Sequence, residues 1–554
     1  MILIKLRPLP GGMIEVSPSG FDPAVRDQFR GVPGALWDRE ARAYVAPAEA
    51  LDGVLTTLEK ARVARIDRSA LRDPPTATRA IASYRKLPGE LRGYQTEGVQ
   101  FLRTVLPQFG AAVLADEMGL GKTVQAILAT KPGQRTIVVC PAVVAGHWAD
   151  EIERWAGEEA LVWTGKKKPK GDPADAFATA PWLVLSFDMF RRLVDHLPLV
   201  SQLIIDELHY VGHSKSLRSK AVRGYVERCA RAHEGAGRPT ITGLTGTPIT
   251  AWLQDLWNPL DLLFPGRFGT WWSFTQRYCG GRFEPIVAKN GSPVLDGEGL
   301  PRRCWKADGV SNLDELQRRL SHFMLRRTKL DSGIELPPRI RTTIPVNLPQ
   351  GAKTELRALM RDVRSPSELK RARAGVEAYK IDAAVDLATE LRGAGQKVLL
   401  FTTRRSHAKA LGERLGCPYV TGSDDPGERK AKLLGVGGAP SDVAVATMFS
   451  VTTGISLTHF DSCVFVGLDW VPSNILQAEA RLHRPGATKT VNVYFLIGKP
   501  SIDEHIRKVV VDRLETFSAV LGAKGTANEI TLARELEDRS DLIGEIVRMV
   551  EETT

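Results

Sequence analysis

The 554-residue sequence contains few cysteines, and none of them forms a paired motif. Its six cysteines lie far apart, without a CxxC pair, which argues against a zinc site or a disulfide framework and favours reduced thiols in the cytoplasm. No run of about 18 apolar residues occurs, and the apolar start is too short for a signal peptide. The sequence therefore predicts a soluble intracellular protein without a membrane-spanning segment.

The charge balance is positive. Lys and Arg number 75 against 64 Asp and Glu, a net charge of +11. This excess favours a polyanionic partner, although charge alone does not choose among nucleic acid, an acidic membrane and simple solubility. The run "GKKKPKG" (165–171) could contact phosphates, but such loops are more often only solvated. The usage of Ala, Arg, Gly and Val suggests a high-GC bacterium or its phage.

Short apolar runs recur along the chain, and each ends near a turn or a polar motif. They lie at 136–140, 182–186, 202–206 and 240–244 in the first half, and at 397–402, 442–447, 462–467 and 491–497 in the second. Helical spacing between many of them predicts parallel sheets covered by helices. Two sets of strands predict an α/β fold with two lobes.

The boundaries of these lobes follow from changes in composition. The proline-rich stretch "LPPRIRTTIPVNLP" (336–349) reads as an extended connector between the lobes. We expect an accessory domain at 1–70, a linker at 71–87, a first lobe at 88–340 with a helical protrusion at about 251–335, a connector at 341–350, a second lobe at 351–522 and a helical extension at 523–554.

The stretch "DEMGLGKT" (116–123) raises the first functional question. It follows an apolar run and precedes helical spacing, as a phosphate-binding loop does, yet Asp116 stands where the usual pattern has its first glycine. Gly119 and Gly121 would let backbone N–H groups approach phosphate oxygens. Lys122 would neutralise the β- and γ-phosphates, and Thr123 would hold Mg²⁺. A tight strand-to-helix turn without a ligand is the alternative.

A pair of carboxylates ends the apolar run "QLIID". Asp206 in this position can reach Mg²⁺ through water, and Glu207 can orient or deprotonate the attacking water. The alternative is a solvated acidic pair that caps the next segment. The acidic pair follows the glycine-rich loop in the order and at the distance expected of a nucleotide site, which favours the catalytic interpretation.

Two further signals are weak when taken alone. In "QAEARLHRPG", Arg481 and Arg484 are three apart, so on a helix they would share a face and could act as arginine fingers; a solvated helix face is the alternative. In "LRGYQTEGVQFL", Gln95 has the donor and the acceptor needed to bind an adenine edge.

Taken together, the motifs resemble the Snf-type branch of the superfamily-two DNA translocases. That family writes its phosphate loop as DEMGLGKT, and "LRRTK" followed by "LPP" marks this branch. The matching stretches span about residues 88–520 in family order and include "LRGYQTEGVQFL", "LADEMGLGKTVQAI", "LIIDELH", "LTGTPI", "FMLRRTKLDSGIELPPR", "KVLLFT" and "QAEARLHRPG".

The resemblance implies two RecA-like lobes and ATP hydrolysis, with Mg²⁺, coupled to movement along double-stranded DNA. By matching positions, it assigns the ATP-site roles described above. Gln477 would help couple the lobes, and Thr245 and Thr247 would link the nucleotide site to DNA. The aromatic residues of 268–281 would form the core of the helical protrusion, rather than a base-stacking platform.

In the second lobe, the resemblance places Thr447 and Gly454 near the DNA backbone and matches Trp470 to the tryptophan that follows motif V. The stretch "TMFSVTTGISL" lacks the paired glycines of most remodellers, and Ala487 replaces a family glutamine. With the wording "QAEARLHR", these departures are closer to the HARP-bearing annealing-helicase subgroup. Residues 36–46 loosely resemble that subgroup's accessory module; a β-rich unit of other role is the alternative.

The expected protein is therefore a monomeric translocase that remodels or reanneals plain, forked or branched DNA. Two other functions stay open at this stage. One is the motor subunit of a restriction or defence system, and the other is a catalytically idle DNA-binding scaffold.

Overall fold

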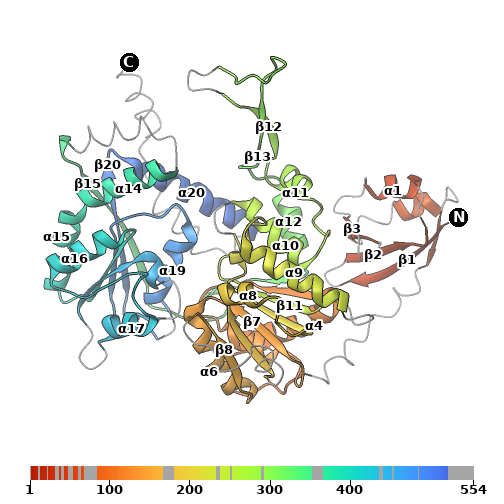
Figure 1. Ribbon diagram of the computed structural model, residues 1–554, viewed down its shortest axis with the longest axis horizontal. Helices are drawn as coiled ribbons and strands as arrows, with labels where there is room; N and C mark the ends of the chain where they lie inside the picture. Colours follow the sequence, from red (N-terminus) through yellow and green to blue (C-terminus); the bar gives the residue numbers. More distant parts are fainter. Residues whose placement is uncertain are drawn as a thin grey trace. The chain divides into compact units, whose positions relative to one another are not determined.

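The computed structural model of the chain, drawn in Figure 1, divides into two compact units, and the main boundary between them falls between Ile334 and Glu335. None of the helices in the described part of the chain has the length and apolar character needed to cross a membrane. The structure describes residues 2–9, 13–20, 23–30, 36–38, 43–47, 54–59, 64–67, 84–165, 180–232, 238–249, 252–287, 292–351, 366–435, 441–451, 455–484 and 486–521.

A small mixed sheet with its own apolar cluster forms at the N-terminus. Its strands run in the order β3-β4-β2-β1-β5, where β1 is parallel to β5 and antiparallel to β2. The elements are β1 (Ile2–Leu9), β2 (Met13–Pro18), α1 (Pro23–Arg30), β3 (Leu36–Asp38), β4 (Ala43–Pro47) and β5 (Ala64–Asp67). Phe29 of α1 stacks on Tyr44 of β4 with ring centroids 4.9 Å apart, which closes helix and sheet around one core.

The first lobe is built on a seven-stranded sheet in the order β14-β6-β11-β10-β7-β9-β8. All of its strand pairs are parallel. The strands are β6 (Ala111–Leu114), β7 (Thr136–Cys140), β8 (Ala160–Trp163), β9 (Trp182–Ser186), β10 (Gln202–Asp206), β11 (Thr240–Leu244) and β14 (Met324–Leu325). The four strands predicted in this half are confirmed with their bounds. The short strands β8 and β14 were not predicted.

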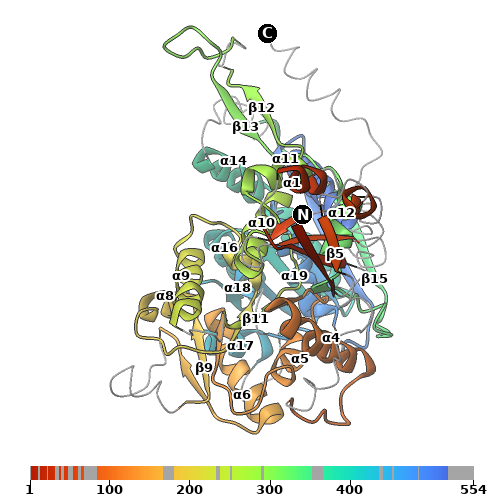
Figure 2. The same ribbon diagram turned by 90° about the vertical axis from the view of Figure 1, so that its right-hand side faces the viewer.

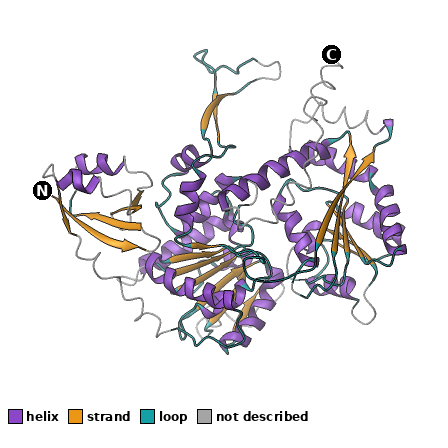
Figure 3. Ribbon diagram, turned by 180° about the vertical axis from the view of Figure 1, so that it is seen from behind, coloured by secondary structure: helices purple, strands orange, loops and turns teal. Residues whose placement is uncertain are grey.

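Helices pack against this sheet (Figure 3). They are α4 (Gly93–Phe109), α5 (Lys122–Leu128), η3 (Ala142–Val144), α6 (Ala145–Ala156), α8 (Phe187–Leu193), η4 (Leu208–Val211) and α9 (Leu217–Ala232). The segment after β11 contains η5 (Leu253–Leu256), α10 (Trp257–Leu263), α11 (Trp271–Tyr278) and α12 (Leu313–Leu320). Between α11 and α12 lies an antiparallel hairpin of β12 (Arg282–Pro285) and β13 (Arg303–Lys306). The protrusion expected here is therefore not purely helical.

The second lobe has a six-stranded parallel sheet in the order β15-β20-β19-β16-β18-β17. Its strands are β15 (Arg339–Asn347), β16 (Val398–Thr402), β17 (Tyr419–Val420), β18 (Val443–Thr447), β19 (Ser462–Phe465) and β20 (Val491–Lys499). Leu399 and Phe401 belong to one buried cluster, whereas Val398 and Leu400 belong to another. Alternate residues of β16 thus face opposite sides of a sheet that is covered on both.

The helices of this lobe are α14 (Pro366–Tyr379), α15 (Ile381–Gly393), α16 (Arg405–Leu415), α17 (Pro426–Leu434), α18 (Met448–Val451), α19 (Pro472–Leu482) and α20 (Ile502–Leu521). The stretch 336–349, interpreted as an extended connector, is indeed extended, but residues 339–347 pair with β20 as the edge strand β15. Pro345 lies within this strand, and an edge strand tolerates proline because one side of its backbone needs no ladder partner.

Candidate nucleotide site

The stretch 116–123 connects β6 to α5. Gly119 has φ 90° and Gly121 has φ 73°, a left-handed conformation that glycine adopts without strain. Gly121 is the N-cap of α5, and no side chain caps this helix end. An additional Cβ on Gly121 would lie 2.4 Å from the Nε2 atom of Gln95. Both glycines are thus required by the backbone of a loop that can present N–H groups to phosphate.

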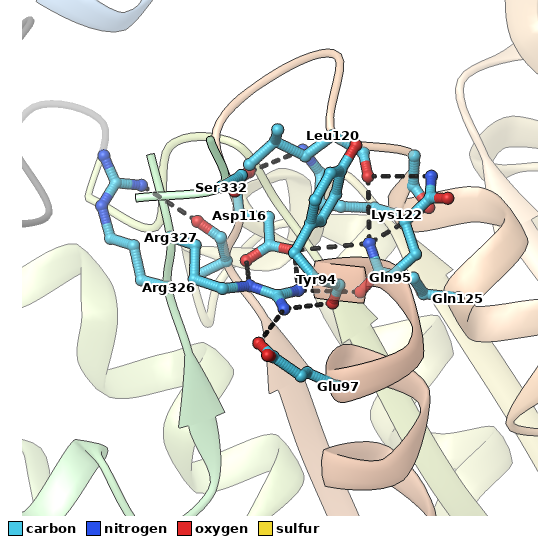
Figure 4. Close-up of polar contacts among 12 residues, drawn as sticks. Tyr94, Gln95, Glu97, Asp116, Leu120, Lys122, Gln125, Arg326, Arg327 and Ser332 are labelled. Atoms are coloured by element: carbon cyan, nitrogen blue, oxygen red, sulfur yellow. Dashed lines mark hydrogen bonds and ion pairs between the residues drawn. The ribbon is translucent and has the colours of Figure 1, made fainter. Parts of the chain in front are cut away.

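Asp116 is the centre of a buried ion pair, which explains the residue in the glycine position. Its Oδ2 accepts a hydrogen bond of 2.6 Å from Nη2 of Arg327, and its Oδ1 accepts one of 3.1 Å from Nε (Figure 4). Asp116 is fully buried, and Arg327 is only 8% exposed. Arg327 also donates to Oε1 of Gln125 at 2.9 Å and to the carbonyl of Tyr94. Asp116 therefore ties the loop to α4, α5 and the segment after β14.

The rest of the "LRRTK" stretch supports the loop from the same side. Nη1 of Arg326 donates to the carbonyl oxygens of Ala115 at 3.0 Å and Gly246 at 3.2 Å. Nζ of Lys329 lies 3.2 Å from Oε1 of Glu117. Although burial opposes ionisation, Lys329 lowers the pKa of Glu117. The sequence identified this stretch as a family marker, but its role as a support for the phosphate loop was missed.

Lys122 begins α5 and folds back over the loop. Its Nζ donates to the carbonyl oxygen of Asp116 at 2.7 Å. Burial lowers the pKa of Lys122, while the negative charges nearby, Glu207 foremost, oppose this shift. A Cβ on Gly246 would lie 3.6 Å from this Nζ and 2.8 Å from Cγ of Met118. The turn after β11 therefore approaches Met118 so closely that a larger residue at position 246 would have to displace this side chain.

The predicted acid pair ends β10, and its geometry is well defined. Oδ2 of Asp206 accepts a hydrogen bond of 2.9 Å from Nε1 of Trp148, and Oδ1 accepts one of 3.0 Å from the N–H of Glu207. Burial and the charge of Glu207 raise the pKa of Asp206 to about 6. Glu207 has φ 53°, which is unusual for a residue other than glycine and is typical of functional sites.

His209 lies beside this pair. Its Nδ1 is 3.3 Å from Oε2 of Glu207 and 3.4 Å from Oγ1 of Thr245. Burial lowers the pKa of His209 to about 4, so the ring is neutral near pH 7. Trp148 and His209 are partners of the acid pair to which the sequence assigned no role, although His209 belongs to the stretch "LIIDELH".

Thr245 and Thr247 follow β11, the strand between β6 and β10. Both are buried, and the N–H of Thr247 donates to Oγ1 of Thr245 at 3.1 Å. Their link to DNA stays a prediction. Gln95 lies at the start of α4, where its Oε1 accepts from the N–H of Arg92 at 3.1 Å and its Nε2 donates to the carbonyl of Leu120 at 3.5 Å. It therefore lies against the phosphate loop, and its contact with adenine also stays a prediction.

The second-lobe candidates centre on α19, and one expectation about them is wrong. Arg481 and Arg484 do not share a helix face, because α19 ends at Leu482 and His483 leaves the helical conformation. Arg484 precedes Pro485 in the sequence, and the residue before proline is driven out of the α region. Burial lowers the pKa of Arg484.

Four other candidates belong to this lobe. Gln477 is buried in α19, and Thr447 is buried at the end of β18. Trp470 packs partly buried against the core, and its carbonyl accepts a hydrogen bond from Arg513. Gly454 lies outside the described residues. The coupling role of Gln477 and the expected contacts of the other three residues with DNA stay predictions.

A buried ion cluster, missed in the sequence, holds α19 against the sheet. Glu479 of α19 is fully buried, with Oε1 3.0 Å from Nε of Arg341 and Oε2 3.1 Å from Nη1 of Arg339. Although burial opposes ionisation, Arg341 and Arg339 lower the pKa of Glu479. The two arginines are two apart on β15, so they lie on one face of the strand. The cluster therefore positions the helix that carries Arg481 in its last turn.

Comparisons with a family model and with curated proteins both find similarity to SNF2-related proteins. Residues 94–363 match the SNF2-related domain. The chain is 30% identical over 447 residues to the DNA annealing helicase and endonuclease ZRANB3 of Bos taurus, a match that covers 76% of this chain and 39% of that protein. It is 27% identical over 469 residues to the SWI/SNF-related matrix-associated actin-dependent regulator of chromatin subfamily A-like protein 1 of Xenopus tropicalis, with 79% and 45% covered.

The matched region spans less than half the length of these two relatives. Among solved structures, the Sulfolobus solfataricus SWI2/SNF2 ATPase core in complex with dsDNA is 22% identical, with 82% of this chain and 96% of that chain covered and a TM-score of 0.35. The resemblance to an annealing helicase noted in the sequence is confirmed by the similarity to ZRANB3.

Proposed function

Because this chain is a member of the SNF2-related family, we propose that it is a DNA-dependent ATPase that moves along double-stranded DNA and remodels or reanneals it. One observation supports this most strongly. The phosphate loop and the pair Asp206–Glu207 follow β6 and β10, on either side of β11, and Lys122 is close enough to both acids for their charges to affect its pKa. The carboxyl edge of a parallel sheet is where α/β proteins bind ligands.

Each group at this edge has a chemical role in hydrolysis. Lys122 leaves its carbonyl partners and neutralises the β- and γ-phosphates of ATP. Glu207 orients and deprotonates the attacking water, and the neutral ring of His209 fixes its carboxylate. Gln95 contacts the adenine edge. The ion pair of Asp116 keeps the loop in shape whether or not nucleotide is bound.

The residues present fit a Mg²⁺ ion held mainly by phosphates. Among the described residues, no three His, Cys, Asp or Glu side chains gather as a metal site, and Mg²⁺ in phosphoryl transfer needs only one or two carboxylates beside the substrate. Asp206, fixed by Trp148, and the hydroxyl of Thr123 would hold it. When bound there, the ion would neutralise part of the phosphate charge.

The second lobe contributes the remaining groups of the proposed motor. Arg481 and Arg484 stabilise the charge of the transition state, Arg481 from the last turn of α19 and Arg484 from the segment beyond it. Gln477 couples this helix to the nucleotide. DNA is bound through its backbone by residues of both lobes, namely Thr245, Thr247, Thr447, Gly454 and Trp470.

The experiment measures ATP hydrolysis without DNA, with single strands and with blunt duplex. We expect duplex to stimulate the rate, and Lys122→Ala and Glu207→Gln each to reduce the stimulated rate about hundredfold. Glu207→Gln should still bind nucleotide, since it keeps Lys122. Glu90→Gln, which removes one member of an exposed ion pair, is the matched control. A duplex-independent rate that survives Lys122→Ala would leave the idle scaffold as the better interpretation.

A further inference from the structure

Three aromatic rings at the base of the β12–β13 hairpin form an exposed cluster, here called the hairpin platform: Trp272, Phe283 and Trp305. Trp272 is 52% exposed and Phe283 is 58% exposed. The ring centroids of Trp272 and Phe283 lie 6.1 Å apart, and Trp305 lies 4.8 Å from Trp272 and 4.9 Å from Phe283. In Figure 2 the hairpin extends from α11. The three rings therefore contact one another, with Trp272 and Phe283 open to solvent and Trp305 partly exposed.

The platform is not part of the core that folds the protrusion. That core uses Phe268, Phe274 and Tyr278, which are buried. The sequence placed all aromatic residues of 268–281 in the core, and for Trp272 this is wrong. A helix with one buried face leaves a tryptophan on its other face exposed. Large exposed aromatic side chains that gather in one place are a common mark of a binding surface.

Local contacts hold the rings in place. Phe283 and Trp305 are directly opposite each other across the two strands. Nε1 of Trp305 donates a 3.1 Å hydrogen bond to Oγ1 of Thr275 in α11. A Cβ on Gly281 would lie 2.4 Å from Cζ2 of Trp305, so glycine lets the indole lie on the turn. The platform is thus preorganised, which lowers the entropy lost when a ligand binds.

The charges of the hairpin are separated between its two faces. Arg282 lies 2.6 Å from Glu284 and 3.0 Å from Asp308, and Lys306 lies 3.4 Å from Glu284. Glu284 and Asp308 are therefore already paired with basic side chains. Arg282, Glu284 and Lys306 lie on the face of the hairpin opposite the rings. Arg303 is two residues from Trp305 on the ring face. It is exposed, and no ion pair is found for it in the described part of the chain. The ring face thus combines stacking surface with positive charge.

We propose that the hairpin platform stacks on unpaired bases where duplex DNA branches, with Arg303 beside the adjoining phosphate. Every base offers a π-face, so aromatic stacking binds single strands with little sequence preference. Arginine adds attraction to the backbone, which a purely apolar protein partner would not need. This inference rests on the proposed function and narrows it, since it selects forked or branched DNA over plain duplex.

The test compares binding of two fluorescent DNAs: a blunt duplex and the same duplex with unpaired arms carrying 2-aminopurine at the junction. Phe283→Leu and Trp272→Leu remove a ring but keep an apolar side chain. Each should weaken binding of the fork about tenfold and abolish the quenching of 2-aminopurine, with blunt-duplex affinity changed less than about twofold. Phe283→Trp should bind the fork like the parent chain. Leu217→Ala, at another exposed apolar side chain of this lobe, is the control.

The outcomes separate the two proposals. Fork affinity that is unchanged in both leucine variants, or an equal loss on fork and blunt duplex, would overturn stacking at a branch. A Phe283→Ala variant that loses fork binding while Phe283→Leu keeps it would also overturn the stacking proposal. That pattern would mean that any apolar side chain suffices, as expected for an apolar protein partner. Absence of duplex-stimulated ATP hydrolysis in the parent chain would reject the motor, while the binding titration would still decide whether the platform holds unpaired bases. Circular dichroism of each variant confirms folding.

Discussion

Replacing Asp116 by asparagine removes the charge that the buried Arg327 requires. The carboxylate accepts two hydrogen bonds from this guanidinium, at 2.6 and 3.1 Å, and neither residue is more than 8% exposed. Removing one partner of such a pair leaves the other charge buried and costs about 3–5 kcal/mol. Asparagine can still accept one bond from Arg327, so we expect about 3 kcal/mol, the lower end of this range.

Urea unfolding followed by tryptophan fluorescence measures this cost. Trp470 is the only one of the 11 tryptophans that lies beyond residue 334, so the signal reports almost entirely on the first unit. With an m-value of about 3 kcal/mol/M, a loss of about 3 kcal/mol lowers the urea midpoint by about 1 M. Glu90→Gln breaks an exposed pair of 3.7 Å and should lower the midpoint by less than about 0.3 M.

A double-mutant cycle tests the cause. Arg327→Met alone should cost about as much as Asp116→Asn, whereas the two changes together should cost at least about 1 kcal/mol less than their sum. The ion pair would then be the reason for aspartate in the glycine position. Strictly additive costs, or a midpoint for Asp116→Asn equal to that of Glu90→Gln, would refute this reasoning.

Three further expectations concern the remaining contacts. Two arginines hold the folded-state pKa of Glu479 below its usual value near 4.3, so its contribution to stability is complete above that pH and is lost as the pH falls through the folded pKa. Glu479→Gln should therefore flatten the acid side of a plot of the free energy of unfolding against pH. An unchanged plot would contradict this. Gly246→Ala should raise KM for ATP several-fold, because the added methyl group would displace Met118 of the phosphate loop. Met118→Ala in the same chain should restore KM, and failure to restore it would argue against the steric cause. Trp148→Phe removes the hydrogen bond to Asp206. In a titration of ATP hydrolysis with Mg²⁺, it should raise the Mg²⁺ concentration for half-maximal activity about tenfold. An unchanged concentration would mean that Asp206 does not hold the metal.

The strands that carry the site were predictable from local pattern. In "TIVVC" and "QLIID", which are β7 and β10, nearly every residue is buried. In a parallel sheet covered by helices on both faces, both sides of each central strand are buried, so the strand is a continuous apolar run. The run therefore predicts the strand and its bounds. The edge strand β15 was not recognised in this way, because only part of it is buried and the proline-rich stretch around it was interpreted as a connector.

The side chains around the site were predictable only where a motif includes them. Lys122 stands in the glycine-rich motif, and Asp206 and Glu207 stand in the acidic motif at the end of β10. Trp148 stands in neither motif, and the same holds for the rings of the hairpin platform, which join α11 to β12 and β13. The end of α19 was also misjudged, because His483 already leaves the helical conformation before Arg484 is reached.

By itself, the sequence determined most of the buried strands of the two lobes, where the glycine-rich loop falls and in which order the motifs occur, since these depend on short-range spacing and burial. Only the tertiary structure decided why Asp116 occupies the glycine position and what holds α19. Asp116 pairs with Arg327, 211 residues later, and Glu479 pairs with Arg341, 138 residues earlier. A buried charge needs a partner, and the fold supplies that partner from a part of the chain that no local period connects to it.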